Sequence, residues 1–328
     1  MPQHVVPFSD EQLRVAINLR TAYEAWIEVE REAGALPYGM AWKTISGRDY
    51  LYELRDRAGN GRSLGVRSEE TEALHASYRE HKETLKRRRE GAAAQLQQNG
   101  RLWRALRLPM MASEPAPILR EADRRRMLGS QLLVVGTNAV LAYALEAGGG
   151  IAGLADETRD FDMAWVAREP VESDRPVADL LKAVDPTFTM NTERNFQARN
   201  SKAYEVELLA APSVMASLPR RDMPRPIPLP EQEWLLWGRF VESFLVARDG
   251  SAVRMVVPDP RWFALHKLWL SRQGKRDTLK RGKDARQGEI LLAVARDALP
   301  LHPLDAEWEA QIPEELRPDW DAWKAKGL

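Results

Sequence analysis

Two aspartates, Asp160 and Asp162, are the residues whose type and spacing most directly suggest chemistry. They flank Phe161 in a segment rich in strand-forming residues, and side chains at positions i and i+2 of a strand face the same side. Two neighbouring carboxylates repel each other, and burying both without a partner is costly. A divalent cation removes that cost, and hard oxygen ligands favour Mg²⁺ or Mn²⁺ over Zn²⁺. The pair alone is weakly specific, because two aspartates at this spacing also arise by chance.

Two further features strengthen the metal interpretation. Gly136-Thr137 falls between an apolar run at 131–135 and an expected helix, where backbone N–H groups favour a phosphate and glycine allows close approach. A glycine at a strand end is also typical of a simple turn. Glu205 and Glu207 share one face of a later strand. Glu207 is the candidate third carboxylate, which would complete a two-metal site and accept a proton from an attacking hydroxyl. Glu205 is expected at a solvent-facing edge.

The elements that must position these residues alternate between strand and helix along the second half of the chain. Apolar runs and their breaks predict strands at 131–135, 161–166 and 203–209, a β-hairpin at 241–257, and helices at 138–147, 178–184, 261–272 and 284–298. This succession indicates an α+β or α/β fold with a mixed sheet and C-terminal helices, and we expect α+β. Trp308, Trp320 and Trp323, near the C-terminus, are expected to anchor the core.

The N-terminal part is expected to be helical around a small β-hairpin at about residues 42–65. Ser9 and Gln12 have the spacing of a helix-capping box. The hairpin interleaves basic and aromatic side chains, which suits a nucleic-acid strand because phosphates meet the cations and bases stack on the rings. A packing module with a solvated face is the alternative. The same two interpretations apply to the basic middle of the long helix that follows, at residues 82–89.

A proline-rich stretch at residues 109–117 is the best candidate for a domain boundary. It predicts an N-terminal region of residues 1–115, which contains the hairpin, and a second domain of residues 116–328.

The composition excludes several classes of protein. A chain of 328 residues with 44% hydrophobic and 29% charged residues is globular. Lysine and arginine total 48 and so do aspartate and glutamate, so any nucleic-acid binding must come from local patches. No apolar run is long enough for a membrane helix, and the N-terminus lacks the pattern of a secretory signal. The absence of cysteine excludes disulfides and thiolate sites and fits a cytoplasmic location.

Taken together, the motifs resemble those of the DNA polymerase β superfamily of nucleotidyltransferases, and more narrowly a bacterial family of stand-alone nucleotidyltransferase-like proteins. That superfamily carries a glycine followed by Ser or Thr after its first strand, an Asp-x-Asp pair, and a third acidic residue on a further strand. The resemblance covers most of the chain, and the ordered set is far more specific than any single motif. Its matching segments are 47–65, 133–139, 158–162, 200–209, 257–268 and 280–287.

The resemblance implies a polymerase β-like core and an enzyme of the EC 2.7.7 type, which moves a nucleoside monophosphate from an NTP to a hydroxyl acceptor. Carried over residue by residue, Asp160, Asp162 and Glu207 are the catalytic and metal-binding residues. Gly136, Thr137 and Lys267 bind the nucleotide, and Mg²⁺ or Mn²⁺ is the cofactor. Thr137 stands where serine is commoner, and Glu207 stands where aspartate is commoner. The added methylene moves that carboxylate outward, so an inactive descendant remains an alternative.

No single motif in the sequence identifies the acceptor. An RNA 3′ end, such as that of tRNA, is the first expectation because of the basic and aromatic N-terminal hairpin. The basic stretch at residues 275–283 could also bind the phosphates of an acceptor, with a solvated loop as the alternative. Two different functions also fit the sequence. One is adenylylation of a protein or small molecule, as in toxin–antitoxin pairs, and the second is nucleic-acid binding by a catalytically silent protein on the same fold.

Overall fold

The computed structural model describes residues 4–154 and 160–327, and the side chain of Asp160 also lies outside the described part. Its contacts group into two compact units. The main unit consists of Met1–Leu19 and Gly100–Leu328, and the inserted unit consists of Arg20–Asn99. The boundary that the sequence indicates near residue 115 stays a prediction.

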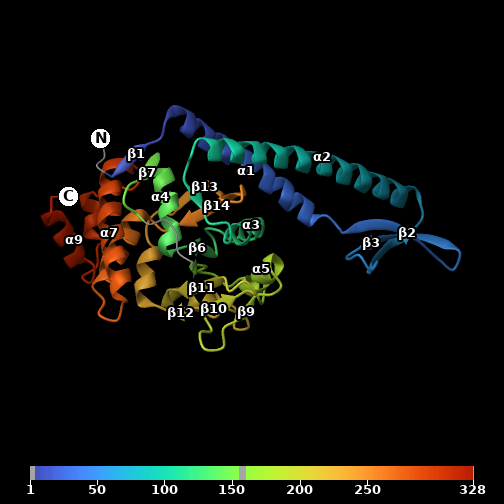
Figure 1. Ribbon diagram of the computed structural model, residues 1–328. Helices are drawn as coiled ribbons and strands as arrows, with labels where there is room; N and C mark the ends of the chain where they lie inside the picture. The colour runs from blue at the N-terminus through green and yellow to red at the C-terminus, as the bar shows by residue number, and fades with distance from the viewer. Residues whose placement is uncertain (1–3, 155–159, 328) are drawn as a thin grey trace. The chain divides into compact units, whose positions relative to one another are not determined.

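Two long helices, α1 (Asp10–Ala35) and α2 (Glu69–Ala105), lead into and out of the inserted unit (Figure 1). Helix α1 begins with the expected capping box, because the Ser9 backbone N–H donates to Gln12 Oε1 at 2.9 Å and the Gln12 N–H donates to Ser9 Oγ at 3.3 Å. Within the inserted unit the two helices are joined by ion pairs from Arg88 to Glu32 and from Arg89 to Glu30. The basic middle of α2 is therefore partly neutralised by α1.

The chain between these helices forms an antiparallel sheet of β2 (Gly39–Ile45), β3 (Arg48–Leu54) and β4 (Gly61–Val66). The predicted hairpin is confirmed, and β4 adds a third strand to it. Ser46 and Gly47, both with positive φ, form the first turn. Several cations of this sheet are held within it: the Arg67 guanidinium lies over the Trp42 ring and the Lys43 ammonium lies over the Tyr52 ring.

The central sheet of the main unit has the strand order β6-β8-β11-β10-β9, with β12 beside β11. Pairing is parallel between β8 and β11 and antiparallel along the rest of that order, which confirms the α+β class with a mixed sheet. The strands are β6 (Leu132–Val134), β8 (Asp160–Trp165), β9 (Thr189–Met190), β10 (Gln197–Arg199), β11 (Glu205–Ala210) and β12 (Ile227–Pro228).

A second sheet is built on the predicted hairpin of β13 (Val241–Ala247) and β14 (Ala252–Val257). Its third strand is β5 (Met110–Met111), which comes from the proline-rich stretch expected to mark a domain boundary and pairs with β13. Buried Met111 explains why this stretch is ordered. Helix α4 lies against this sheet, where Ser243 Oγ donates to the Ala142 carbonyl at 3.0 Å. The remaining elements of this part are α3 (Ala116–Arg124), η1 (Gly136–Ala139), α4 (Val140–Glu146), α5 (Pro176–Val184), η2 (Pro212–Ser217), and the pair β1 (Val5–Pro7) and β7 (Gly149–Ile151).

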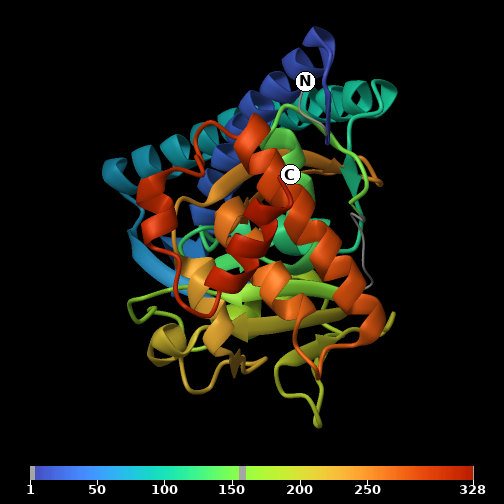
Figure 2. The same ribbon diagram turned by 90° about the vertical axis from the view of Figure 1, so that its left-hand side faces the viewer.

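The C-terminal helices, seen from the front in Figure 2, are held by a chain of tryptophans. Ring centroids follow one another at 5.1 to 5.4 Å through Trp237, Trp262, Trp308, Trp320 and Trp323. The expectation that the last three anchor the core is confirmed, because all three are buried. The elements are η3 (Pro230–Leu236), α6 (Pro260–Ser271), α7 (Thr278–Ala298), α8 (Ala306–Ala310) and α9 (Arg317–Ala325). No helix among the described residues is both long and apolar enough to cross a membrane.

A buried carboxylate, Asp259, fixes the start of α6. It caps the helix by accepting from the Arg261 backbone N–H, it pairs with the Arg261 guanidinium at 2.8 Å, and it contacts His302 Nδ1 at 3.1 Å. Burial alone would raise the pKa of Asp259, but the hydrogen bonds from His302 and Arg261 outweigh it and lower that pKa below its usual value. Asp259 therefore stays charged and sets the position of the helix.

We expect Asp259→Ala to lower the free energy of unfolding by about 3–5 kcal/mol, because it leaves a buried cation without its partner. Urea denaturation of the full chain measures this. Arg14→Ala, which breaks an exposed pair with Glu11 in α1, is the matched control and should change little. Equal effects of the two substitutions would contradict the assigned role of Asp259.

Candidate active site

Asp162 and Glu207 lie side by side on the central sheet. Strands β8 and β11 are parallel, and Asp162 is in direct register with Glu207. Alternate residues of both strands, such as Phe161 and Val206, are fully buried on the opposite face. Residues paired in register on adjacent strands point to the same face. The two carboxylates predicted from distant segments therefore come together on one side of the sheet.

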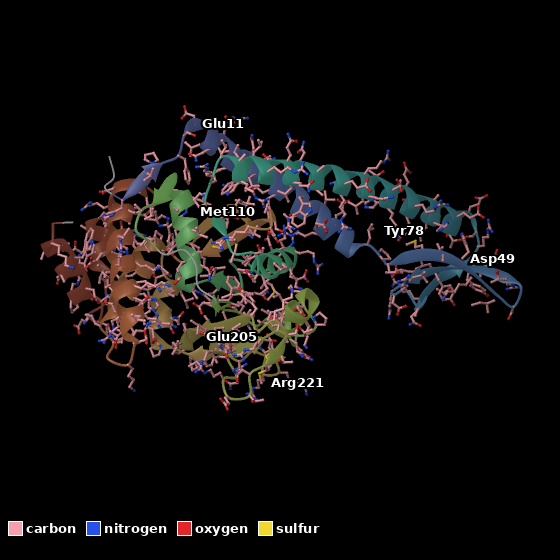
Figure 3. All side chains as sticks on the ribbon, viewed as in Figure 1. Glu11, Asp49, Tyr78, Met110, Glu205 and Arg221 are labelled. Atoms are coloured by element: carbon pink, nitrogen blue, oxygen red, sulfur yellow. The ribbon has the colours of Figure 1, made fainter. Side chains whose placement is uncertain are left out.

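The predicted partner Asp160 begins β8 in register with Glu205, which Figure 3 labels on the same sheet. The Asp160 side chain lies outside the described residues, so its metal-binding role stays a prediction. Glu205 was expected to face solvent at a strand edge, but β11 is an inner strand of the sheet and Glu205 is only partly exposed. Its carboxylate makes a close ion pair with Arg199 of β10.

Gly136 brings the backbone directly against the Asp162 carboxylate. The strand β6 ends there, and Gly136 adopts a φ of +67°, which favours glycine. A Cβ at this position would lie 2.1 Å from Asp162 Oδ2. The Val135 N–H also donates to the Asp162 carbonyl at 3.0 Å. The glycine is required by this close approach and not merely by a turn. The chain then continues through the short 3₁₀-helix η1 before α4 begins, rather than entering an α-helix at once as expected.

Gln197, which sequence reasoning missed, holds the two glutamates. It lies on β10 in register with Glu207, and its amide Nε2 donates to Glu205 Oε2 and to Glu207 Oε1, each at 3.0 Å. Its own Oε1 accepts from Asn191 Nδ2 at 2.7 Å. Gln197 is buried, so these bonds orient the Glu207 carboxylate. No pattern in the sequence marks this residue, because its role depends on strand pairing.

The predicted site residues Gly136, Thr137, Asp162, Glu207 and Lys267 all line one cavity of about 320 Å³. Its walls also come from the loop around β12, from η3, and from α6 and α7. The other lining residues are Val135, Phe196, Leu209, Ile227, Leu229, Glu231, Gln232, Leu235, Phe263, His266, Leu270, Arg276, Lys280, Lys283 and Asp284. The cavity is acidic at the sheet and basic at α7, which suits a ligand carrying phosphates bound next to a cation.

Lys267 lies in the cavity wall, buried and paired. Its Nζ donates to Asp284 Oδ1 at 2.9 Å, and Arg276 Nε donates to Asp284 Oδ2 at 2.9 Å. Burial alone would raise the pKa of Asp284, but the charge and hydrogen bond of Lys267 lower it overall. The three groups tie α6 to α7, whose backbones approach closely at Gly288. The predicted contact of Lys267 with a triphosphate stays a prediction.

Lys280 and Lys283 are the cations that the structure adds to the site. Three residues apart on α7, they share a helix face and both line the cavity. Burial lowers the pKa of Lys283, and the charge of Lys267 lowers it further, while Asp284 and Asp162 act in the opposite direction. The sequence marked these lysines as part of a basic stretch for an acceptor. The helix expected at residues 284–298 begins at Thr278 instead, and this earlier start places both lysines on one helix face.

The donor set at the sheet fits a hard divalent cation. Asp162 and Glu207 offer carboxylate oxygens on one face, which is what Mg²⁺ prefers. Among the described side chains, which do not include that of Asp160, no group of three or more carboxylates or imidazoles is arranged to hold a metal ion. A two-carboxylate site is nevertheless usual for Mg²⁺, which takes its remaining ligands from water and substrate phosphates.

Comparison with known proteins gives one family. A family model described as "Nucleotidyltransferase" matches residues 114–313, more than half of the chain. No curated protein matches. Among solved structures, the chain is similar to an antigenic nucleotidyltransferase-like protein from Paracoccidioides brasiliensis, with 17% sequence identity, coverage of 66% of this chain and 91% of that chain, and a TM-score of 0.37.

We expect Gly136→Ala to disrupt the cavity, because the added Cβ would collide with Asp162 and alanine disfavours the positive φ. Binding of ATP, GTP, CTP and UTP in magnesium buffer, measured by calorimetry, should weaken at least tenfold, which corresponds to ~1.4 kcal/mol. Gly150→Ala is the matched control, since a Cβ there meets nothing within 4 Å. Undiminished binding by the Gly136 variant would contradict this role.

Proposed function

Since this chain belongs to the nucleotidyltransferase family of phosphorus-transferring enzymes, we propose that it moves a nucleoside monophosphate from an NTP to a hydroxyl acceptor with the help of a divalent cation. The observation that carries this proposal is the register of Asp162 with Glu207 across the parallel strands β8 and β11, beside Gly136 and inside one cavity. That arrangement combines a site for a hard cation with room for a phosphate chain.

In this proposal Asp162 and Glu207, joined by Asp160, hold Mg²⁺ or Mn²⁺. The bound cation supplies charge neutralisation at the phosphates and makes the acceptor hydroxyl more acidic. Two carboxylates side by side would fit this role, since their mutual repulsion favours the binding of a divalent cation. Gln197 donates a hydrogen bond to the Glu207 carboxylate and so fixes its orientation, although the glutamate side chain is one methylene longer than aspartate.

The protein's own groups then orient the substrate. Lys280, Lys283 and the paired Lys267 face the triphosphate and neutralise its charge, and Thr137 offers its hydroxyl at the glycine bend. The acceptor oxygen attacks the α-phosphorus in line, a new P–O bond forms, and the bond to the β-phosphate oxygen breaks. Glu207 accepts the proton of the acceptor hydroxyl, and pyrophosphate leaves with the bonding electron pair. Positioning and charge neutralisation supply most of the acceleration.

We expect Asp162→Asn and Glu207→Gln each to lower transfer from labelled NTPs by at least ~100-fold, because each removes a charge from the cation site. Magnesium-dependent NTP binding measured by calorimetry should weaken in parallel. Asp321→Asn, at an exposed position of α9, is the control and should keep both. Glu207→Asp tests the reach of the side chain and should retain more transfer than Glu207→Gln. Wild-type levels of transfer in both neutral variants would refute the proposed mechanism.

For the acceptor we propose the 3′ hydroxyl of an RNA such as tRNA. The supporting observation is a groove of about 1050 Å³ within the inserted unit, whose basic lining residues are Arg55, Arg79, Lys82, Lys86 and Arg89. Glu80 and Glu83 are the acidic residues in the same groove. An excess of cations in one concave surface suits a polyanion, because each phosphate contact releases condensed counterions.

We expect the double substitution Arg55→Glu and Lys86→Glu to weaken RNA binding at 100 mM salt by at least tenfold and to reduce its salt dependence. RNA-dependent incorporation of labelled nucleotide should fall with it, while magnesium-dependent NTP binding stays unchanged. Arg20→Glu, on the exposed part of α1, is the control. Incorporation into protein or an aminoglycoside without any into RNA would replace the RNA acceptor by those classes. RNA binding without magnesium-dependent NTP binding would instead favour a catalytically silent binding protein.

A further inference from the structure

Two neutral polar side chains, His266 and Gln232, are enclosed in the cavity wall. Each is only 5% exposed, and both line the cavity that holds Asp162 and Glu207. Among the described residues, neither ring nitrogen of His266 nor the Oε1 atom of Gln232 has a hydrogen-bond partner. Buried polar atoms in folded proteins are nearly always hydrogen-bonded. Two such side chains in a single cavity therefore indicate a ligand that supplies the missing hydrogen bonds.

The two side chains come from adjoining elements. His266 is on α6 and Gln232 is on η3, and Trp234 of η3 makes an edge contact with the His266 ring at 6.3 Å between centroids. A second edge contact, between Trp234 and Trp269 at 5.3 Å, holds η3 on α6. The His266 ring is therefore held by packing against Trp234, and Gln232 lies two residues from that tryptophan on the same short helix.

Their chemistry differs from that of the cations nearby. Burial and the charges of Lys267 and Arg276, against the opposing effect of Asp284, lower the pKa of His266 to about 3, so its ring is neutral and offers one donor and one acceptor. The Gln232 amide also offers both kinds of group. Lys280 and Lys283 suit phosphates, whereas a neutral donor–acceptor set suits the edge of a nucleobase. Apolar side chains of the same cavity, including Leu235, Phe263 and Leu270, can cover the faces of a base.

We propose that His266 and Gln232 hydrogen-bond the nucleobase of the bound NTP and thereby determine which base the enzyme accepts. This inference rests on the proposed function and adds the residues that set substrate specificity. A site built to hydrogen-bond a substrate group rejects an analogue that lacks it, because the buried groups of the protein are then left unpaired. The phosphates contribute affinity common to all four NTPs, and the pair on η3 and α6 contributes the difference between them.

The test is calorimetric binding of ATP, GTP, CTP and UTP, with inorganic tripolyphosphate as a probe for the phosphate contacts alone. His266→Phe keeps the ring contact with Trp234, and Gln232→Leu keeps the volume, so both variants should fold with an unchanged or higher melting temperature. Each should weaken the preferred NTP by about tenfold or more and flatten the preference among the four bases. Tripolyphosphate affinity should stay within about twofold of wild type.

Lys280→Met is the matched control for the other half of the cavity. It should weaken all four NTPs and tripolyphosphate alike and leave the base preference unchanged. If both His266→Phe and Gln232→Leu keep the wild-type order and spacing of the four affinities, base recognition by this pair is wrong while the proposed function stands. If the wild-type chain binds no NTP, both the inference and the proposed function fail.

Discussion

The parallel pairing of β8 with β11 is the constraint on which the rest of the site depends. It places Asp162 beside Glu207 on one face, while the alternate residues of both strands fill the core. Two like charges at adjacent positions of a sheet destabilise it, so the surroundings must compensate. The amide of Gln197 does part of this by donating to both glutamates of β11. In the proposed function, a divalent cation would balance the negative charge that remains on Asp162 and Glu207.

The cavity wall formed by α6 and α7 contains buried cations, whose charge must also be compensated. Asp284 accepts from Lys267 and from Arg276, so one carboxylate joins α6 to α7 and offsets two positive charges. Breaking a buried pair of this kind is strongly destabilising. The cluster thus fixes the helix that carries Lys280 and Lys283, and it keeps the positive side of the cavity opposite the acidic sheet. The start of α6 is held separately by Asp259.

The basic and aromatic side chains of the inserted unit suggest a nucleic-acid partner, but several of them make contacts within the unit itself. Arg88 and Arg89 of α2 pair with acidic residues of α1, and Arg67 and Lys43 lie over aromatic rings of the sheet. Those side chains stabilise the unit itself. The cations around its groove are a different set, apart from Arg89 and from Lys82, whose ammonium donates to the Tyr38 carbonyl and to the Tyr78 hydroxyl. The groove cations carry the proposal of an RNA acceptor. Counting basic residues along the sequence does not separate these two sets.

The sequence by itself determined the faces of the strands and the ends of several elements. The alternation of acidic and apolar residues in β8 and β11 decides which side chains share a face, because the side-chain period of a strand is two. The Ser9–Gln12 cap and the turn of the C-terminal hairpin are equally local, and both were predicted. The family could also be recognised from the sequence, because its motifs are short and occur in a fixed order along the chain.

Only the tertiary structure decided which strands are neighbours and what each charged group contacts. Gln197 orients Glu207 through strand register, and Lys267 is paired with Asp284. Strand β5 extends the second sheet from the proline-rich stretch expected to mark a domain boundary. The enclosure of His266 and Gln232 in one cavity arises in the same way, since η3 and α6 meet through tryptophan packing. Contacts of this kind depend on burial and pairing between distant segments, so a local pattern of residue types does not predict them.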